Sequence, residues 1–373
     1  MMESGAGITL FVSLVAGLAA GFVMHRSDFC LAGMVRDLFL FRSTFMLRIF
    51  ALYLLVNMLL TEFSRELGLL PLFPYPLFGL PGLANVIGGA LFGIGMVLAG
   101  GCVVGTLYRM GAGSILSLTA FAGLVTGSAL YAEIHGWWKA VAGKMQFTAG
   151  KVTMAQMLGV NQAFMVLPLA LLLLWAIRCW RKNGVLERRT AIEGYLQPWK
   201  AAILLALITW ASALLIGMPL GITTCYAKMG AWLEMQLFPV HAAGVEYFKA
   251  MPLNYVNPLF RVAYQGGPGW KADGIAMIQF PLVAGIVFGS FISARLLGEF
   301  RIYARVPAVQ YFSALLGGII MGLAARMAPS CNVWHLLGGI PVLATQSILF
   351  VAGLLPGAWL GARVMSSIVL RGR

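Results

Sequence analysis

Charged residues are scarce in this chain. Asp, Glu, Lys and Arg make up 10% of its 373 residues, 60% are hydrophobic, and the mean hydropathy is +0.88. A soluble protein of this length needs far more charge to cover its surface. Long apolar runs separated by short polar breaks instead predict an all-α polytopic membrane protein. No segment resembles a detachable soluble domain, so we expect residues 1–373 to form a single membrane domain.

Metal-binding and redox motifs are also missing. The five cysteines are odd in number and widely spaced, which argues against a disulfide framework or a zinc site. The four histidines are scattered, and the sequence has no nucleotide-binding motif and no pair of haem-ligating histidines. We therefore expect no metal, no cofactor and no enzymatic activity. The cysteines are Cys30, Cys102, Cys179, Cys225 and Cys331.

The N-terminus lacks a basic n-region and an A-x-A cleavage site, so we expect a first membrane span there and not a cleaved signal peptide. A span needs about 20 apolar residues. By that criterion the sequence predicts nine spans. They cover residues 7–24, 44–63, 83–100, 114–133, 159–177, 200–218, 275–296, 308–328 and 341–363.

The net charge of +14 follows from basic residues in short loops, which is typical of the cytoplasmic side of membrane proteins and does not require a nucleic-acid partner. Basic stretches lie at 25–42, 178–189, 295–305 and 371–373. Nine spans with all four stretches inside place the N-terminus outside and the C-terminus in the cytoplasm. The segments 134–158 and 237–274 then form outer loops. The second is rich in aromatic residues, Pro and Gly, and we expect interfacial helices in it.

Two stretches of the sequence match at one constant offset. GGALFGIGMVLAGGC ends at Cys102 and GGIIMGLAARMAPSC ends at Cys331, and both begin with two glycines and share a third. A weaker pair, GFVMHRSDFC and GMPLGITTC, ends at Cys30 and Cys225 and needs a one-residue gap. The sequence thus predicts two inverted repeats, over residues 1–158 and 199–373. A helix and a basic cytoplasmic loop connect them over residues 159–198.

The segment after each of these four cysteines contains glycine and is too short to cross a bilayer alone, which predicts re-entrant half-helices. Inverted repeats with broken helices are a common plan in secondary transporters. The N-terminus of a half-helix carries free N–H groups and a partial positive charge, which suit an anion. A buried cysteine stays protonated, and its polarisable S–H group suits a soft anion that carries sulfur or selenium.

We therefore predict that Cys30, Cys102, Cys331 and Cys225 relay the anion, and that Gly100, Gly101 and Gly105 let backbone amides approach it. Two alternatives stay open at this point: the cysteines are small apolar fillers, or the glycines serve only close helix packing.

Charged residues near the breaks are expected mostly to pair with one another. Arg109 is the exception, because it is the best candidate for guiding an anion at the inner mouth. His335 follows Cys331 and is expected to form hydrogen bonds at a helix end.

The stretches HRSDFCLAGMVRD, LAGGCVVGTLYRMGAG and GGIIMGLAARMAPSCNVWHLLGGIP resemble the YeeE/YedE family of sulfur-transport membrane proteins over nearly the whole chain. The resemblance implies a bacterial inner-membrane transporter with two inverted halves and an hourglass shape. Characterised members take up thiosulfate through cysteines at a constriction, which correspond to Cys30, Cys102 and Cys331. Some members are associated with a small soluble sulfur-carrier protein.

The substrate predicted first is therefore thiosulfate. One alternative is a selenium or other reduced-sulfur species carried by the same architecture. Another is a membrane component of sulfur redox or sulfurtransfer chemistry.

Overall fold

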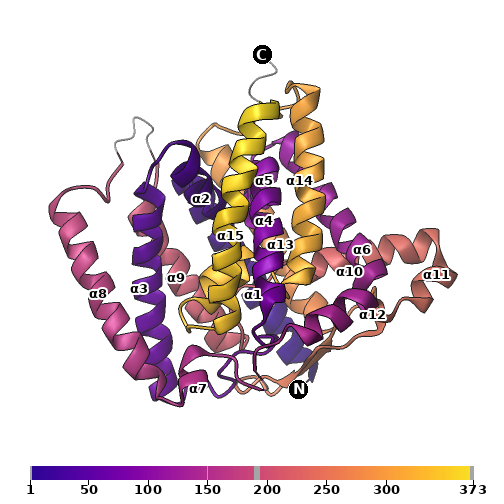
Figure 1. The fold of residues 1–373 in the computed structure, drawn as a ribbon, viewed down its shortest axis with the longest axis horizontal. Helices are drawn as coiled ribbons and strands as arrows, with labels where there is room; N and C mark the ends of the chain where they lie inside the picture. Colours follow the sequence, from indigo (N-terminus) through magenta and orange to yellow (C-terminus); the bar gives the residue numbers. More distant parts are fainter. Residues whose placement is uncertain (1, 149, 189–193, 370–373) are drawn as a thin grey trace.

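The computed structural model describes residues 2–148, 150–188 and 194–369 (Figure 1). Within these ranges, nine helices are long and apolar enough to span a membrane. They are α1 (Met2–Ser27), α3 (Phe45–Glu66), α4 (Leu83–Leu98), α6 (Ile115–Lys144), α8 (Gln162–Lys182), α9 (Pro198–Leu215), α13 (Gly274–Leu296), α14 (Ala308–Met327) and α15 (Thr345–Val364). Each overlaps one predicted span, so the prediction of nine spans is confirmed.

Shorter elements fill the intervals between these helices. They are α2 (Leu31–Leu40), α5 (Val103–Gly111), α7 (Met154–Leu158), α10 (Thr224–Leu237), α11 (Pro239–Gly244), α12 (Glu246–Lys249), and the π-helical segments η1 (Val333–Gly339) and η2 (Met365–Val369). The strands β1 (Leu253–Val256) and β2 (Ala263–Gly266) form an antiparallel hairpin in which Leu253 faces Gly266. This hairpin departs from the predicted all-α class, although the fold is mostly helical.

The hairpin is stabilised by contacts that the local sequence pattern does not predict. The rings of Tyr255 and Tyr264 pack with their centroids 5.3 Å apart. The Tyr255 hydroxyl donates a hydrogen bond of 2.6 Å to the carbonyl of Ile216, just after α9. The strands are therefore stabilised by the helix end on which they lie.

Helix α6 is the second departure, because it continues to Lys144 through much of the predicted outer loop at 134–158. The indole of Trp138 is buried and donates a hydrogen bond of 3.1 Å to the carbonyl of Met327 at the end of α14. That contact stabilises the extra turns, so the connection before α7 is shorter than predicted.

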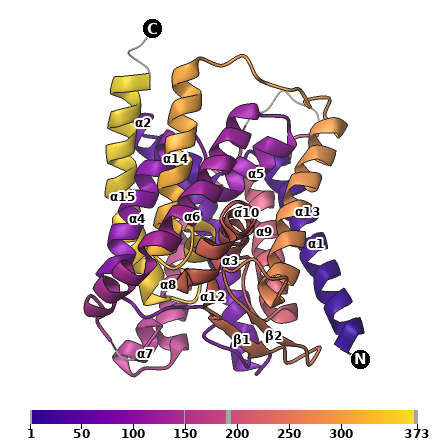
Figure 2. The same cartoon turned by 90° about the vertical axis from the view of Figure 1, so that its right-hand side faces the viewer.

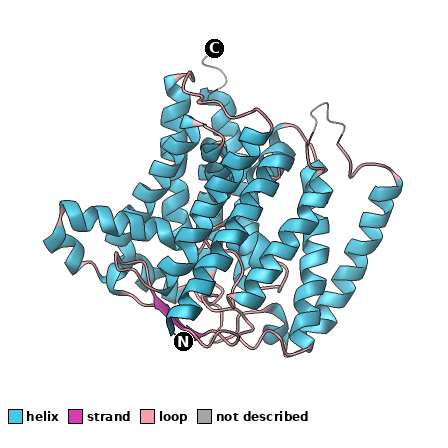
Figure 3. Cartoon of the chain, turned by 180° about the vertical axis from the view of Figure 1, so that it is seen from behind, coloured by secondary structure: helices cyan, strands magenta, loops and turns pink. Residues whose placement is uncertain are grey.

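The start of α1 and the end of α15 lie at opposite ends of the molecule, as an odd number of spans requires (Figure 1). The end of α8, the start of α9 and the connection from α13 to α14 lie at the same end as the end of α15, whereas α7 and the hairpin lie at the other end (Figures 1 and 2). Seen from behind, the hairpin is again at the end that holds the N-terminus (Figure 3). The sidedness in the cell stays a prediction. The basic stretch 371–373, and Arg189 at the end of the basic stretch 178–189, lie outside the described residues.

Three pairs of long helices pack with their backbones in contact. In α1 and α13, a Cβ built on Gly17 would lie 3.0 Å from the Cα of Gly285. In α6 and α14, a Cβ on Gly123 would lie 3.0 Å from the Cα of Gly318. In α4 and α15, a Cβ on Gly93 would lie 3.0 Å from the carbonyl carbon of Gly357. Small residues at such positions let membrane helices approach closely.

This packing predicts that Gly21→Ala destabilises the protein. A Cβ at Gly21 would lie 2.7 Å from the Cα of Ile286 and would overlap its carbonyl oxygen, and backbone cannot yield as a side chain can. Overpacking of this kind costs about 1–3 kcal/mol, so we expect a lower thermal midpoint in detergent.

Gly143→Ala is the matched control. Gly143 also lies in a helix, α6, but a Cβ there meets nothing within 4 Å. Alanine favours the helix over glycine by about 1 kcal/mol, so the midpoint should stay or rise. Equal effects of the two substitutions would contradict the packing argument.

Candidate functional site

Two short helices begin at predicted relay cysteines. Cys30 is the N-cap of α2, and its sulfur accepts a hydrogen bond of 3.2 Å from the backbone N–H of Gly33. Cys102 is the N-cap of α5, and its sulfur accepts one of 3.4 Å from the N–H of Gly105. Both bonds follow the pattern that serine and aspartate form as N-caps. Each sulfur therefore lies where the amides of a helix N-terminus point.

The two sulfurs lie against the same point of the backbone. A Cβ built on Gly105 would be 3.5 Å from Sγ of Cys102 and 3.8 Å from Sγ of Cys30. The absence of a side chain at Gly105 thus keeps the space between the two thiols open. Of the three glycines predicted to admit an anion, Gly105 is the one that the structure places beside both sulfurs.

Gly100 and Gly101 have a different place. Gly100 adopts a left-handed conformation, with φ of +69°, in the turn that ends α4, and its carbonyl accepts a hydrogen bond from the Arg109 guanidinium. A Cβ on Gly101 would lie 3.5 Å from the same guanidinium. These two glycines therefore shape the turn that Arg109 closes.

Arg109 also lines a cavity of about 420 Å³, together with His25, Asp28, Glu299 and Arg301. Its lining residues come from the ends of α1 and α5 and from the segment that follows α13. The structure thus places the partly buried Arg109 at a cavity, where its guanidinium also bonds the carbonyl of Gly100.

Cys331 and Cys225 are fully buried, and all four cysteines belong to one buried cluster; their exposed fractions are 8% for Cys30, 2% for Cys102 and 0% for Cys225 and Cys331. The backbone amides of Val333 and Trp334 lie against the Cys331 sulfur at the start of η1.

Cys225 differs from the other three because it lies within the first turn of α10. Its thiol donates a hydrogen bond of 3.0 Å to the carbonyl of Ile222. The remaining cysteine, Cys179, lies in α8 and is outside this cluster.

The charged residues near the breaks mostly form ion pairs and hydrogen bonds within the protein. Arg36 pairs with Asp37 at 2.8 Å. Lys228 pairs with Asp273 at 2.6 Å and also donates to the carbonyls of Gly269 and Lys271. His335 hydrogen-bonds Ser347 and the carbonyl of Ala328 through its two ring nitrogens, at 2.9 and 3.0 Å.

Sequence reasoning missed two buried polar residues at this site, Tyr226 and Asn332. Each directly follows a cysteine of the second half, Cys225 or Cys331. The carboxamide of Asn332 lies against the Cys102 thiol. Neither side chain has a hydrogen-bond partner for its polar atoms. The sequence does carry a signal for them. The position after the cysteine is polar in the second half, whereas Cys30 and Cys102 are followed by the apolar residues Leu31 and Val103.

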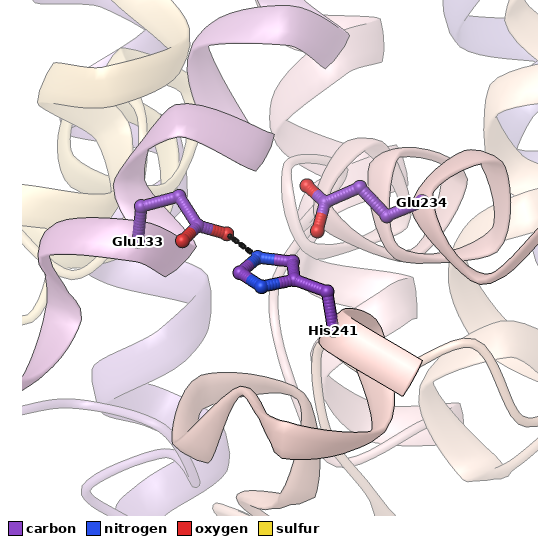
Figure 4. Close-up of side chains that lie close together, drawn as sticks. All are labelled: Glu133, Glu234 and His241. Carbon is purple, nitrogen blue, oxygen red and sulfur yellow. Dashed lines mark hydrogen bonds and ion pairs between the residues drawn. The ribbon is translucent and has the colours of Figure 1, made fainter. Parts of the chain in front are cut away.

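A separate cluster could hold a metal ion. Glu133 of α6, Glu234 of α10 and His241 of α11 offer ligand atoms that lie within 4.8 Å of one another, with the imidazole between the two carboxylates (Figure 4). Nε2 of His241 is 2.9 Å from the Glu133 carboxylate, which raises the pKa of His241. Burial raises the pKa of Glu234, and the charge of Glu133 adds to that effect.

Nine candidate spans in the described part of the chain define a multi-pass membrane protein, and four cysteines belong to its main buried core. Residues 26–360 match the family described as Sulphur transport, and the chain belongs to this family of transport proteins. The family membership that the sequence motifs predicted is therefore confirmed.

Two thiosulfate transporters, both called TsuA, are similar over nearly their whole length. The protein from Spirochaeta thermophila is 30% identical, covering 94% of this chain and 98% of its own. The protein from Escherichia coli K12 is 28% identical, covering 93% of this chain and 92% of its own. The probable transporter YedE of Escherichia coli is 29% identical over a shorter region, 38% of this chain and 31% of its own.

The Glu133–His241 pair predicts a pH dependence. Because the folded pKa of His241 is raised, the stabilising contact of α11 with α6 is fully present below about pH 6.5, the unfolded value, and is lost as the pH rises through the folded pKa. Glu133→Gln should lower the pKa of His241 toward its ordinary value, which NMR titration of labelled histidine in detergent would measure.

Glu246→Gln is the control for this titration, because Glu246 pairs with Lys139 on an exposed surface and does not bond His241. An unchanged pKa of His241 in Glu133→Gln would contradict the ion pair.

Proposed function

We propose that this protein imports thiosulfate across the bacterial inner membrane, and that the anion passes along the thiols of Cys30, Cys102 and Cys331. The observation that carries the proposal is the meeting of the Cys30 and Cys102 sulfurs beside Gly105, each at the N-terminus of a short helix. The family membership and the two thiosulfate transporters that the chain resembles support the same substrate.

The chemistry of this arrangement suits a soft anion. Helix N-termini offer N–H groups and a partial positive charge without a buried cation. Protonated thiols add weak donors on polarisable sulfur atoms, which replace part of the hydration of an exposed sulfur without binding it tightly. A fixed positive charge at the same place would hold the anion too strongly for rapid release.

We also propose that α2, α5, η1 and the start of α10 are the predicted half-helices of two inverted repeats. The pairing of the long helices supports this: α1 packs on α13 while α9 packs on α3, and α4 packs on α15 while α14 packs on α6. The expected counterparts of the first four long helices, α1, α3, α4 and α6, are α9, α13, α14 and α15 in that order. Exchanging each helix with its counterpart turns the α1–α13 contact into the α9–α3 contact, and the α4–α15 contact into the α14–α6 contact. Inverted repeats place the site between the two halves.

Cys225 has a different role in this proposal from the one that the sequence predicted. Its S–H group is already donated to the carbonyl of Ile222, so it has less to offer a passing anion than the other three. Arg109 attracts the anion to, or releases it from, the cavity at the inner mouth. A soluble sulfur carrier on that side stays a prediction.

Cysteine substitutions test the relay. We expect Cys102→Ser and Cys331→Ser to lower thiosulfate uptake at least about tenfold, the factor that corresponds to one lost contact of about 1.4 kcal/mol, because a hydroxyl is smaller and far less polarisable than a thiol. Uptake of labelled thiosulfate is measured in cells that lack other importers, with equal amounts of protein in the membrane.

Cys225→Ser is the matched control, since a serine hydroxyl can still donate to the Ile222 carbonyl, and its uptake should fall much less. Wild-type uptake in both Cys102→Ser and Cys331→Ser would refute the relay.

A competition series tests the substrate. Thiosulfate should compete best against labelled thiosulfate, whereas sulfate, which has no exposed soft sulfur, should compete poorly. Selenite competing more strongly than thiosulfate would favour the selenium alternative.

A further inference from the structure

Two buried side chains that directly follow Cys225 and Cys331 keep polar atoms without a hydrogen-bond partner. Tyr226 and Asn332 both have an exposed fraction of 0%. The hydroxyl of Tyr226 has no hydrogen-bond partner, and neither Nδ2 nor Oδ1 of Asn332 has one. Buried polar groups are nearly always paired, and an unpaired one destabilises the fold.

The same protein shows what a structural pair of these residue types looks like. Tyr53 and Asn57 of α3 are also buried, but the Tyr53 hydroxyl donates to the carbonyl of Leu337 at 2.8 Å. Nδ2 of Asn57 in turn donates to that hydroxyl at 3.0 Å. Tyr226 and Asn332 are therefore as buried as this pair, but their hydrogen-bond donors lack partners among the described residues.

The unused donors gather around the thiols. The Asn332 carboxamide lies against the Cys102 thiol. Tyr226 directly follows Cys225 and belongs to the same buried cluster as the four cysteines. Its ring is held edge-on by Phe121, with the centroids 5.4 Å apart. The phenol is thus held by packing before any ligand arrives.

The two faces of this site offer different chemistry. The cysteines of the first half, Cys30 and Cys102, accept hydrogen bonds from their own helices and are followed by apolar residues. The second half contributes an amide and a phenol, which are hard, neutral donors. An anion with one soft end and several oxygen atoms matches both faces at once.

We propose that Tyr226 and Asn332 bind the oxygen atoms of the transported anion while the Cys30 and Cys102 thiols contact its sulfur. The inference rests on the proposed transport function and narrows its substrate to an oxyanion with an exposed sulfur atom, as in thiosulfate. Hydrosulfide, which has no oxygen atoms, would make the thiol contacts alone.

The test uses Tyr226→Phe and Asn332→Leu in the full-length protein. Each removes the polar atoms and keeps most of the side-chain volume. We expect the thiosulfate concentration that gives half-maximal uptake to rise about tenfold or more, because a hydrogen bond to an anion is lost. The stabilisation of purified protein by added thiosulfate, read as a thermal shift, should shrink in parallel.

Thermal stability without thiosulfate separates this role from a structural one. Removing an unpaired buried hydroxyl should leave the midpoint of Tyr226→Phe unchanged or raised. Tyr53→Phe is the matched control: it removes a paired hydroxyl, so its midpoint should fall while its half-saturating thiosulfate concentration stays as in the wild type.

Competition by hydrosulfide gives a second readout. The same concentration of hydrosulfide should half-inhibit uptake in the wild type and in the Asn332→Leu variant, provided that thiosulfate is supplied at the half-saturating concentration of each protein. Wild-type half-saturation in both Tyr226→Phe and Asn332→Leu would overturn the inference while leaving thiosulfate transport intact. Absence of thiosulfate uptake by the wild-type protein would instead refute the proposed function, and with it the inference.

Discussion

Backbone contact between paired long helices is the interaction on which the rest of this structure depends. In lipid, apolar side chains gain little by leaving the tails for one another, so van der Waals packing decides which helices associate. Gly17 with Gly285, and Gly123 with Gly318, let backbones approach at positions where any Cβ would meet main-chain atoms. These pairs form a rigid frame, and α2, α5 and η1 lie within it. The positions of the thiols are thus set by glycines that never touch them.

An interruption of a helix at membrane depth is tolerated only where its polar backbone groups are buried in protein or line a water-filled cavity. The structure meets this demand partly with sulfur, since Cys30 and Cys102 accept bonds from the N–H groups of Gly33 and Gly105. The same thiols are therefore structural caps and also polarisable groups of the interior. This double use explains why a small apolar filler and a ligand group are hard to tell apart for a single cysteine, and why the proposed relay depends on two sulfurs that lie beside the same residue, Gly105.

The sequence predicted the nine spans because a span is a local property, a run of apolar residues of sufficient length. It also singled out the four cysteines that lie buried in the core, because each follows an apolar run and precedes a glycine-containing segment. It could not predict the β1–β2 hairpin, which depends on the contact of Tyr255 with Ile216. Nor could it predict that the Cys225 thiol is engaged, or that Tyr226 and Asn332 lack partners, because a hydrogen bond and its absence are properties of the packed molecule.

In the proposed arrangement of two inverted repeats, the two halves contribute unlike groups to the site. In the first half the thiols of Cys30 and Cys102 are followed by apolar residues, and in the second half the thiols of Cys225 and Cys331 are followed by a phenol and an amide. An ion that is the same on all sides would gain nothing from such a difference. An ion with a sulfur end and an oxygen end would be oriented by it, so in the proposed function this difference between the halves is what distinguishes thiosulfate from sulfate and from hydrosulfide.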